Sequence, residues 1–433
     1  MKGMPKNTKT AKKFFEHLKL YSPNISENIR HLELNSFDNL LLKEPSLSVI
    51  IMCKDEQRCI ARCLNAIKNN IGINDEVIVI DTGSADDTLN ILNNFSMTNK
   101  YSIIETSWNN DFAEIRNLGI SQATKDWIVF IDADETIEKG SFENLKSHLS
   151  IVDTLNTTVV CCPAIVNSGG HVVQTVRRII PNNDSVFYFG MVHEEPRHIN
   201  KSELNFLAFD DVILHHDGYM KSVSSAKQKQ ERNTSLLYTM IDKEPLNPKW
   251  YYLLCRDGKG VLEENFYRDS LLKVITLCGQ APFYEEYKLR ALSDLIAHYL
   301  SAGDIENAKY YLEDLKKLAP NMTDTLYWDI FIQLIIFEYA YHQFIQQIID
   351  YKQTNKGLDY GSLNSNGFHL DYLLSQLFFN IRDYNSCFNI LKKLEDAQYG
   401  EYQENYMELY DALQKYLLQI GEENEKKIFH KTT

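Results

Sequence analysis

The sequence predicts an α/β protein in which a mostly parallel sheet, covered by helices, precedes an all-α half. Between about residues 45 and 132, short continuous apolar runs alternate with segments of helical spacing, the pattern of strands buried on both faces. Residues 159–216 are β-rich and broken by turn sequences such as NSGG and PNND. After about residue 220 the pattern is helical and punctuated by prolines.

Length and composition limit the class of protein. A chain of 433 residues favours two domains, and contents of 44% hydrophobic and 24% charged residues are those of a globular protein with a substantial core. The formal net charge of −14 argues against nucleic acid or an anionic membrane surface as the main partner.

The elements follow in order. Residues 1–44 have weak helical patterning and end before Pro45. The expected strands are 47–52, 76–80, 101–106 and 127–132, and the expected helices between them are 57–70, 86–95 and 111–123. In such sheets ligands bind beyond the carboxyl ends of the strands, which is where the polar motifs of this sequence fall.

The helical half contains a repeat-like unit. In residues 291–321, Leu292, Leu295 and Tyr299 share one helix face, a Gly-Asp turn follows, and Pro320 ends the unit. This spacing is typical of a tetratricopeptide repeat, and residues 370–397 repeat it loosely. An ordinary helical bundle is the alternative. The predicted organisation is a helical segment 1–44, a catalytic domain 45–220 and a helical domain 221–433 that binds a peptide or forms a dimer.

The motif DTGSADDT, residues 81–88, follows the second expected strand. Gly83 permits a tight turn, and Ser84 with Asp87 can form a capping box that opens a helix. Helix capping does not explain Asp81, an acid at the tip of a strand, where a base or ribose could be recognised.

The segment IVFIDADETIEKG, residues 128–140, crowds Asp132, Asp134 and Glu135 at the end of a buried strand. Carboxylates this close repel one another, and a divalent cation turns that repulsion into attraction. Arg116, in WNNDFAEIRN, faces the same edge from the preceding helix. It could meet a diphosphate or form a helix salt bridge.

Further charged residues gather downstream. Arg177 and Arg178 are adjacent, VHEEP holds His193, Glu194 and Glu195, and LHHDGY holds His215 and His216. Each histidine alone is more often structural. Together the groups offer an imidazole and carboxylates for a metal, cations for phosphate and a carboxylate for proton transfer.

In this order, the motifs resemble those of the family 2 glycosyltransferases with the GT-A fold, over residues 45–220. The sequence departs from the family at Asp55, where an asparagine is usual before the glutamate. The resemblance implies Asp134 and His216 as ligands of Mg²⁺ or Mn²⁺. It implies Glu194, Glu195 or His193 as the base, which the sequence does not separate. The nucleotide-sugar contacts that it implies are Cys53, Asp55, Glu56, Asp81, Ser84, Arg116, Asp132, Ala133 and Arg178.

A narrower resemblance, to the glycocin S-glycosyltransferases, extends through NPKW (247–250) and the helical half. It implies inverting transfer of a hexose, glucose by expectation, from a UDP-sugar to a cysteine, and serine as a further acceptor, of a bacteriocin precursor peptide. A homodimer is also expected. The alternatives are a cell-envelope or polysaccharide glycosyltransferase of the same family and a non-catalytic peptide-binding repeat scaffold.

The eight cysteines form no C-x-x-C pair, so we expect no structural zinc site. No apolar stretch follows the basic N-terminal residues, and no apolar run is long enough for a membrane span. These features predict a cytoplasmic protein with reduced thiols.

Overall fold

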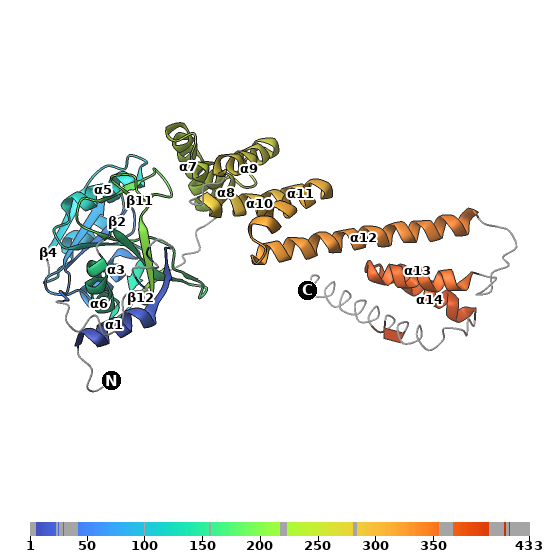
Figure 1. Ribbon diagram of the computed structural model, residues 1–433, viewed down its shortest axis with the longest axis horizontal. Coiled ribbons are helices and arrows are strands. Elements are labelled where there is room, and N and C mark those ends of the chain that lie inside the picture. Colours follow the sequence, from blue (N-terminus) through green and yellow to red (C-terminus); the bar gives the residue numbers. More distant parts are fainter. Residues whose placement is uncertain are drawn as a thin grey trace, which may run out of the picture. The chain divides into compact units, whose positions relative to one another are not determined.

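The structure is a computed structural model, and it describes residues 6–22, 25, 29, 42–98, 100–155, 157–216, 223–279, 284–354, 367–397, 411–412 and 415 (Figure 1). The chain divides into two compact units, Met1–Ser270 and Leu271–Thr433. The first contains the sheet, and the second is helical in the residues described.

The main sheet has ten strands. Its parallel centre consists of β5 (Trp127–Asp132), β2 (Leu47–Cys53), β3 (Glu76–Asp81) and β4 (Lys100–Glu105), in that spatial order. The order reverses at β2, because β3 and β4 extend to one side and β5 is added on the other. In open α/β sheets such a switch point forms a ligand crevice at the carboxyl ends of the strands.

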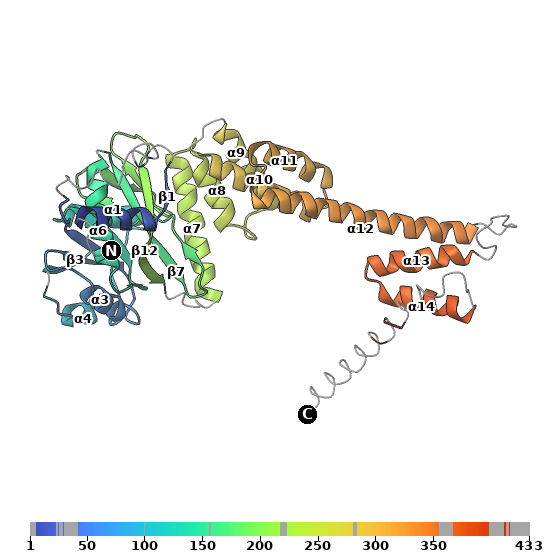
Figure 2. The ribbon, with the colours of Figure 1, turned by 60° about the horizontal axis from the view of Figure 1, so that its bottom comes forward.

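The central strands read as continuous apolar runs because both faces are buried. On one face Val49, Val79 and Ile131 join the core that packs against α3 (Ile60–Lys68), α4 (Thr88–Asn94) and α6 (Ser141–Val152). On the other face Ile50 and Phe130 join the core with α5 (Phe112–Gln122). Figure 1 shows α5 on one side of the sheet and α3 and α6 on the other, and Figure 2 shows α3 beside α4. All strands and helices predicted between residues 47 and 132 are present, with small differences at their ends.

The β-rich stretch completes the sheet. It contains β7 (Val159–Asn167), β8 (Val172–Val173), β9 (Ile179–Pro181) and β12 (Asn205–His216). A short β6 (Glu135–Ile137) pairs antiparallel with the end of β12. A separate two-stranded sheet joins β10 (Val186–Phe189) to β11 (Glu195–His198). Arg177 and Arg178 lie in the connection before β9 and not within a strand.

The N-terminal segment differs from its helical prediction. After α1 (Lys6–His17) the chain forms β1 (Leu18–Tyr21), which pairs antiparallel with β12 at the edge of the sheet. The helix α1 packs beside α6 on the same face of the sheet, through Phe14. Most of residues 23–41 lies outside the described part of the chain. The strand was missed because most of its side chains are exposed and show no alternation.

Two helices after residue 220 belong to the first unit. They are α7 (Val223–Lys243) and α8 (Pro248–Asp257), and α8 contacts the β10–β11 hairpin through Trp250 and Phe189. Composition predicted the boundary between residues 220 and 221, whereas the compact units divide between Ser270 and Leu271. The helical half of the sequence therefore supplies part of the sheet-containing unit.

The second unit is built from helix pairs. After α9 (Glu264–Cys278), which crosses the boundary, α10 (Glu285–Ser301) and α11 (Ile305–Leu318) pack around Leu292, Ala308 and Leu312. The long α12 (Thr323–Thr354) leads to a second pair, α13 (Phe368–Asn380) and α14 (Tyr384–Asp396). Both predicted repeat-like units are helix pairs closed by tight turns, as in tetratricopeptide repeats.

Two further properties concern the whole chain. All eight cysteines are buried and form no disulfide. No helix within the described ranges is long and apolar enough to cross a membrane.

Candidate active site

The candidate site lies at the carboxyl ends of β2, β3 and β5, beside the switch point of the sheet. In-register pairing brings Cys53 at the end of β2 beside Asp81 at the end of β3, and places Asp132 beside Met52. The sheet therefore gathers three motifs that are distant in the sequence, as the alternating pattern predicted.

Asp81 is buried, and its carboxylate closes the turn that follows β3. Its Oδ1 accepts from the backbone N–H groups of Gly83, at 3.0 Å, and Ser84, at 2.9 Å. The Ser84 hydroxyl donates to the other oxygen. Asp81 thus has a structural role in this loop, which explains an acid at the strand tip by local hydrogen bonding.

The predicted capping box of Ser84 and Asp87 does not form. The helix α4 begins at Thr88 after Asp87, whose side chain makes no capping hydrogen bond. Asp86 instead accepts from the backbone N–H of Thr88 at 2.9 Å. Ser84 is used elsewhere, because it accepts from the N–H of Asp55 at 2.9 Å as well as donating to Asp81.

Asp55 and Glu56 form the loop after β2. Asp55 has a φ of 54°, a left-handed conformation that aspartate tolerates better than most residues. Its Oδ1 accepts from the N–H of Ala85 at 2.7 Å, so Asp55 ties the β2 loop to the β3 loop. The Glu56 carboxylate lies 2.9 Å from the Cys59 thiol, and burial raises the pKa of Cys59 to about 12.

Asp132, the first acid after the fourth predicted strand, pairs with Arg178. The guanidinium contacts both carboxylate oxygens, one of them at 2.6 Å. Burial alone would raise the pKa of Asp132, but the charge of Arg178 outweighs it and the pKa lies below its usual range. Glu135 is buried beneath this pair, and its burial raises its pKa to about 7. Ala133, between the two acids, is also buried.

Asp134 and His216 lie next to each other in the candidate site. The Nε2 atom of His216, at the end of β12, lies 3.2 Å from Oδ2 of Asp134. Two cis ligands of one octahedral ion at about 2.1 Å stand roughly 3 Å apart, so this pair fits Mg²⁺ or Mn²⁺ as two protein ligands. His215 points to Glu138 instead, with Nε2 2.8 Å from its carboxylate. Residues 217–219 of the motif lie outside the described residues.

Arg116 and Glu194 form a second buried pair. Nε of Arg116 donates to Oε1 of Glu194 at 2.7 Å, and the guanidinium lies over the rings of Phe130 and Tyr188. One of its terminal nitrogens is 3.8 Å from Asp132. The other, Nη1, is buried with no hydrogen-bond partner among the described residues. A cation with a free donor beside Asp132 suits an anionic ligand.

His193 and Glu195, on either side of Glu194, contact α8. The Nε2 atom of His193 lies 2.6 Å from the carboxylate of Asp257, and Glu195 accepts from Lys249 at 2.7 Å. Lys249 and Asp257 were not among the predicted site residues. The NPKW motif was the available signal, since it places a lysine next to a tryptophan at a predicted domain junction.

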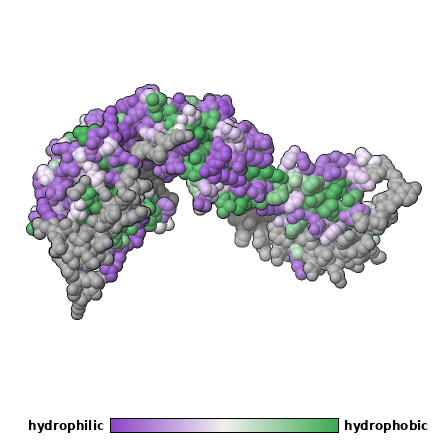
Figure 3. Space-filling model, in the orientation of Figure 1, coloured by the Kyte–Doolittle hydropathy of each residue, from purple (hydrophilic) through white to green (hydrophobic). Residues whose placement is uncertain are grey.

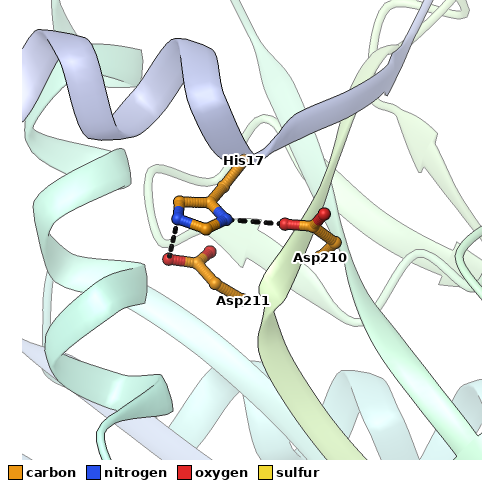
Figure 4. A group of neighbouring side chains, drawn as sticks. All are labelled: His17, Asp210 and Asp211. Carbon is orange, nitrogen blue, oxygen red and sulfur yellow. Dashed lines mark hydrogen bonds and ion pairs between the residues drawn. The ribbon is translucent and has the colours of Figure 1, made fainter.

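One group of acids and histidine elsewhere has the spacing of a metal site. His17, Asp210 and Asp211 join α1 to β12 (Figure 4). His17 directs its two ring nitrogens to different carboxylates, and Lys19 lies 3.1 Å from Asp210. Opposite nitrogens of one imidazole cannot bind the same ion, and the lysine already neutralises an acid. This group is therefore an ion-pair network that fastens α1 to the sheet edge.

Comparisons with known proteins show what the chain is similar to. Residues 48–220 match the family described as "Glycosyl transferase family 2". The chain is 28% identical over 363 residues to the SPbeta prophage-derived glycosyltransferase SunS of Bacillus subtilis strain 168, which covers 82% of this chain and 83% of SunS. Among solved structures it is similar to S. aureus TarS 1–349 in complex with UDP-GlcNAc, at 18% identity and a TM-score of 0.38, covering 63% of this chain and 92% of TarS 1–349.

The sheet, the motif order and the family match agree with one another. Residues 48–220 match glycosyl transferase family 2, and the mixed sheet of the first unit is of the GT-A kind. The chain is similar to SunS through most of its length, helical half included.

Proposed function

We propose that the protein is an inverting glycosyltransferase that moves a hexose, glucose by preference, from a UDP-sugar to a cysteine of a bacteriocin precursor peptide. The similarity to SunS, which extends beyond the catalytic domain, is the observation that supports a peptide acceptor. The resemblance to glycocin S-glycosyltransferases supports cysteine as the acceptor, with serine as a second one. Eight free thiols support a reducing, cytoplasmic location.

In this proposal the donor lies across the carboxyl ends of β2, β3 and β5. Asp134 and His216 would hold Mg²⁺ or Mn²⁺, which when bound neutralises charge on the departing diphosphate. Arg116, whose Nη1 is buried without a partner among the described residues, would meet the diphosphate there. Asp132 keeps Arg178 in place, so that a second buried cation faces the donor side.

Inversion at the sugar carbon requires the acceptor to attack from the face opposite the diphosphate. Glu194 is the proposed base, because its carboxylate lies at the site while His193 and Glu195 are engaged by α8. The proton of the acceptor thiol passes to Glu194, the new C–S bond forms, and the electron pair of the broken C–O bond leaves with UDP. Arg116, hydrogen-bonded to Glu194, orients the carboxylate.

A direct test is to incubate the protein with UDP-glucose, Mn²⁺ and a cysteine-containing precursor peptide, and its Cys→Ser variant. The proposal expects the peptide mass to rise by one hexose, with the sugar located on the cysteine by fragmentation. Transfer to a lipid or glycan acceptor, and to neither peptide, would contradict a peptide acceptor but would still support glycosyltransferase activity. If the protein turned over no UDP-sugar, the result would favour the alternative of a non-catalytic peptide-binding scaffold.

We also propose that the second unit forms a homodimer through α12. Tyr327, Ile330, Leu334 and Phe337 recur at three- and four-residue spacing, and each is at least half exposed. Figure 3 shows hydrophobic residues gathered along this helix. Further along α12, Tyr341 and Ile348 pack on α13. The apolar stripe therefore has one part that α13 covers and one part that is exposed. A second helix with a similar apolar face is suited to cover the exposed part.

The size and charge of the stripe favour a second copy of the chain. Residues 330–337 contain no charged side chain, which suits an obligate apolar interface. Four half-exposed large side chains offer about 400 Å², a large share of the roughly 800 Å² per partner of a standard interface. We expect Leu334→Glu to convert a dimer to a monomer by light scattering, and Gln347→Glu, on another face of α12, to leave it unchanged. A monomeric wild type would contradict the dimer.

A further inference from the structure

The loop between β10 and β11, residues 190–194, carries the proposed base and has two residues in left-handed conformations. Gly190 has a φ of 116°, and a Cβ there would stand 2.9 Å from Cη2 of Trp250. His193 has a φ of 51°, which is uncommon for a residue with a side chain. Such backbone persists only where the surroundings hold it, so the contacts around this loop determine where Glu194 points.

The helix α5 holds one side of the loop. Asn117 exchanges hydrogen bonds with the backbone of Tyr188, both at 2.8 Å. The N–H of Phe112 donates to the carbonyl of Met191 at 3.0 Å. With the pair of Arg116 and Glu194, these contacts come from the domain that matches the family.

The helix α8, outside the family match, holds the other side. Nζ of Lys249 donates to the carbonyl of His193 at 3.0 Å and lies 2.7 Å from the Glu195 carboxylate. Asp257, at the other end of α8, contacts the His193 ring. The Lys249 ammonium therefore contacts the residues immediately before and after Glu194.

Lys249 contradicts the local rules for a helix. It follows the N-cap Asn247 and Pro248, so its positive charge lies at the positive end of the helix dipole. It is also buried, with 5% of its surface exposed. Local conflicts of this kind concentrate at functional sites, where the cost is offset by a specific requirement.

We propose that Lys249 is a positioning residue for glycosyl transfer, in that its contacts with His193 and Glu195 fix the loop that aims Glu194 at the acceptor. This role rests on the proposed function of Glu194. It extends the catalytic machinery into α8, beyond the residues that define the family. In this role Lys249 acts through His193 and Glu195, so its removal is expected to affect the transfer step and to leave donor binding intact.

The test compares Lys249→Met with Lys243→Met, which removes an exposed lysine at the end of α7. Hydrogen exchange of peptides spanning residues 189–197 measures the loop without any substrate. UDP titration in the presence of Mn²⁺ measures the donor side, and transfer from UDP-glucose to the Cys→Ser variant of the precursor peptide, the acceptor that depends most on the base, gives kcat and KM. Asp257→Asn, which keeps the shape of the side chain, provides a second variant where Lys249→Met fails to fold.

For Lys249→Met, the proposal expects exchange in the loop to speed at least tenfold and kcat to fall about 100-fold, since a displacement of about 1 Å has that effect. The dissociation constant for UDP should stay within twofold. The double variant Lys249→Met/Glu195→Gln should stay slow, because the bond to the His193 carbonyl is still missing. Recovery of kcat in the double variant would show that Lys249 acts only as a counter-ion of Glu195.

Unchanged loop exchange, or unchanged kcat, in Lys249→Met would overturn the proposal. Equal loss of UDP binding and kcat would show a general structural role and also overturn it. A wild type that turns over no UDP-sugar would instead contradict the proposed function, and loop exchange would then still decide whether Lys249 fixes the loop.

Discussion

His216 lies 3.2 Å from Asp134, whereas its neighbour His215 turns to Glu138 on the opposite side of β12. Alternation along the strand sends the two adjacent imidazoles to different partners, and one of these partners belongs to the acidic motif. This arrangement separates a candidate ligand from a structural histidine by one position in the chain.

That separation supplies a matched pair of variants. We expect His216→Ala and Asp134→Ala to lower Mn²⁺-dependent turnover of UDP-glucose at least 100-fold, because each removes a proposed ligand of the ion. His215→Ala should retain activity within about threefold. Steady-state kinetics with varied Mn²⁺ measures this. Full turnover in excess chelator would remove the metal role.

The two acids of the Asp-Ala-Asp motif should differ in stability. Asp132→Ala leaves Arg178 buried without its partner, and we expect the free energy of unfolding to fall by about 2–3 kcal/mol. Asp134→Ala removes a repelling carboxylate and should change stability by less than about 0.5 kcal/mol. Urea unfolding of both variants, followed by circular dichroism, measures the difference. Equal losses would contradict the assignment of Asp132 to Arg178.

A comparison of serine and cysteine acceptors tests whether Glu194 acts as the base. A hydroxyl is almost never ionised at neutral pH, while a thiol supplies a small fraction of thiolate. We therefore expect Glu194→Gln to slow transfer to serine by roughly 10²–10⁴-fold and transfer to cysteine much less. Raising the pH should restore part of the rate with cysteine. Rates for a precursor peptide and its Cys→Ser variant across pH give the answer, and equal losses at every pH would make Glu194 a positioning residue.

A buried acid at the opposite end of the sheet should govern acid stability. Glu76 is fully buried, and although burial opposes its ionisation, Lys100 and hydrogen bonds from Thr124 and Ser48 lower its pKa to about 2. Its ordinary value is 4.5, so this depressed pKa stabilises the fold above about pH 4.5, and the contribution is lost as pH falls toward 2.

We expect Glu76→Gln to lose about 1–3 kcal/mol at pH 7 and to show a shallower decline of stability in acid. Glu105→Gln, at the exposed end of the neighbouring strand, is the control. Denaturant unfolding at pH 7, 4 and 3 measures both. A wild type and a Glu76→Gln variant that lose stability in parallel would show that other groups control the acid transition.

The sheet could be predicted because its strands are buried on both faces, which leaves uninterrupted apolar runs, and because parallel strands align their ends. The pairing of Asp134 with His216 followed from family resemblance. Lys249 lies in the NPKW motif, but its contacts could not be predicted, because its partners lie more than fifty residues away and no local pattern encodes a contact between a helix and a loop. The capping box of Ser84 and Asp87 was wrong for the same reason: the Ser84 hydroxyl accepts from Asp55 in the neighbouring loop and does not cap α4.

The eight buried thiols have a consequence for an enzyme whose proposed acceptor is itself a thiol. Cys53, Cys59 and Cys63 line the end of the sheet where the donor would lie, and burial raises the pKa of each. A protonated, covered sulfur is a poor nucleophile. In the proposed reaction, these covered thiols would therefore not compete with a peptide cysteine for the sugar.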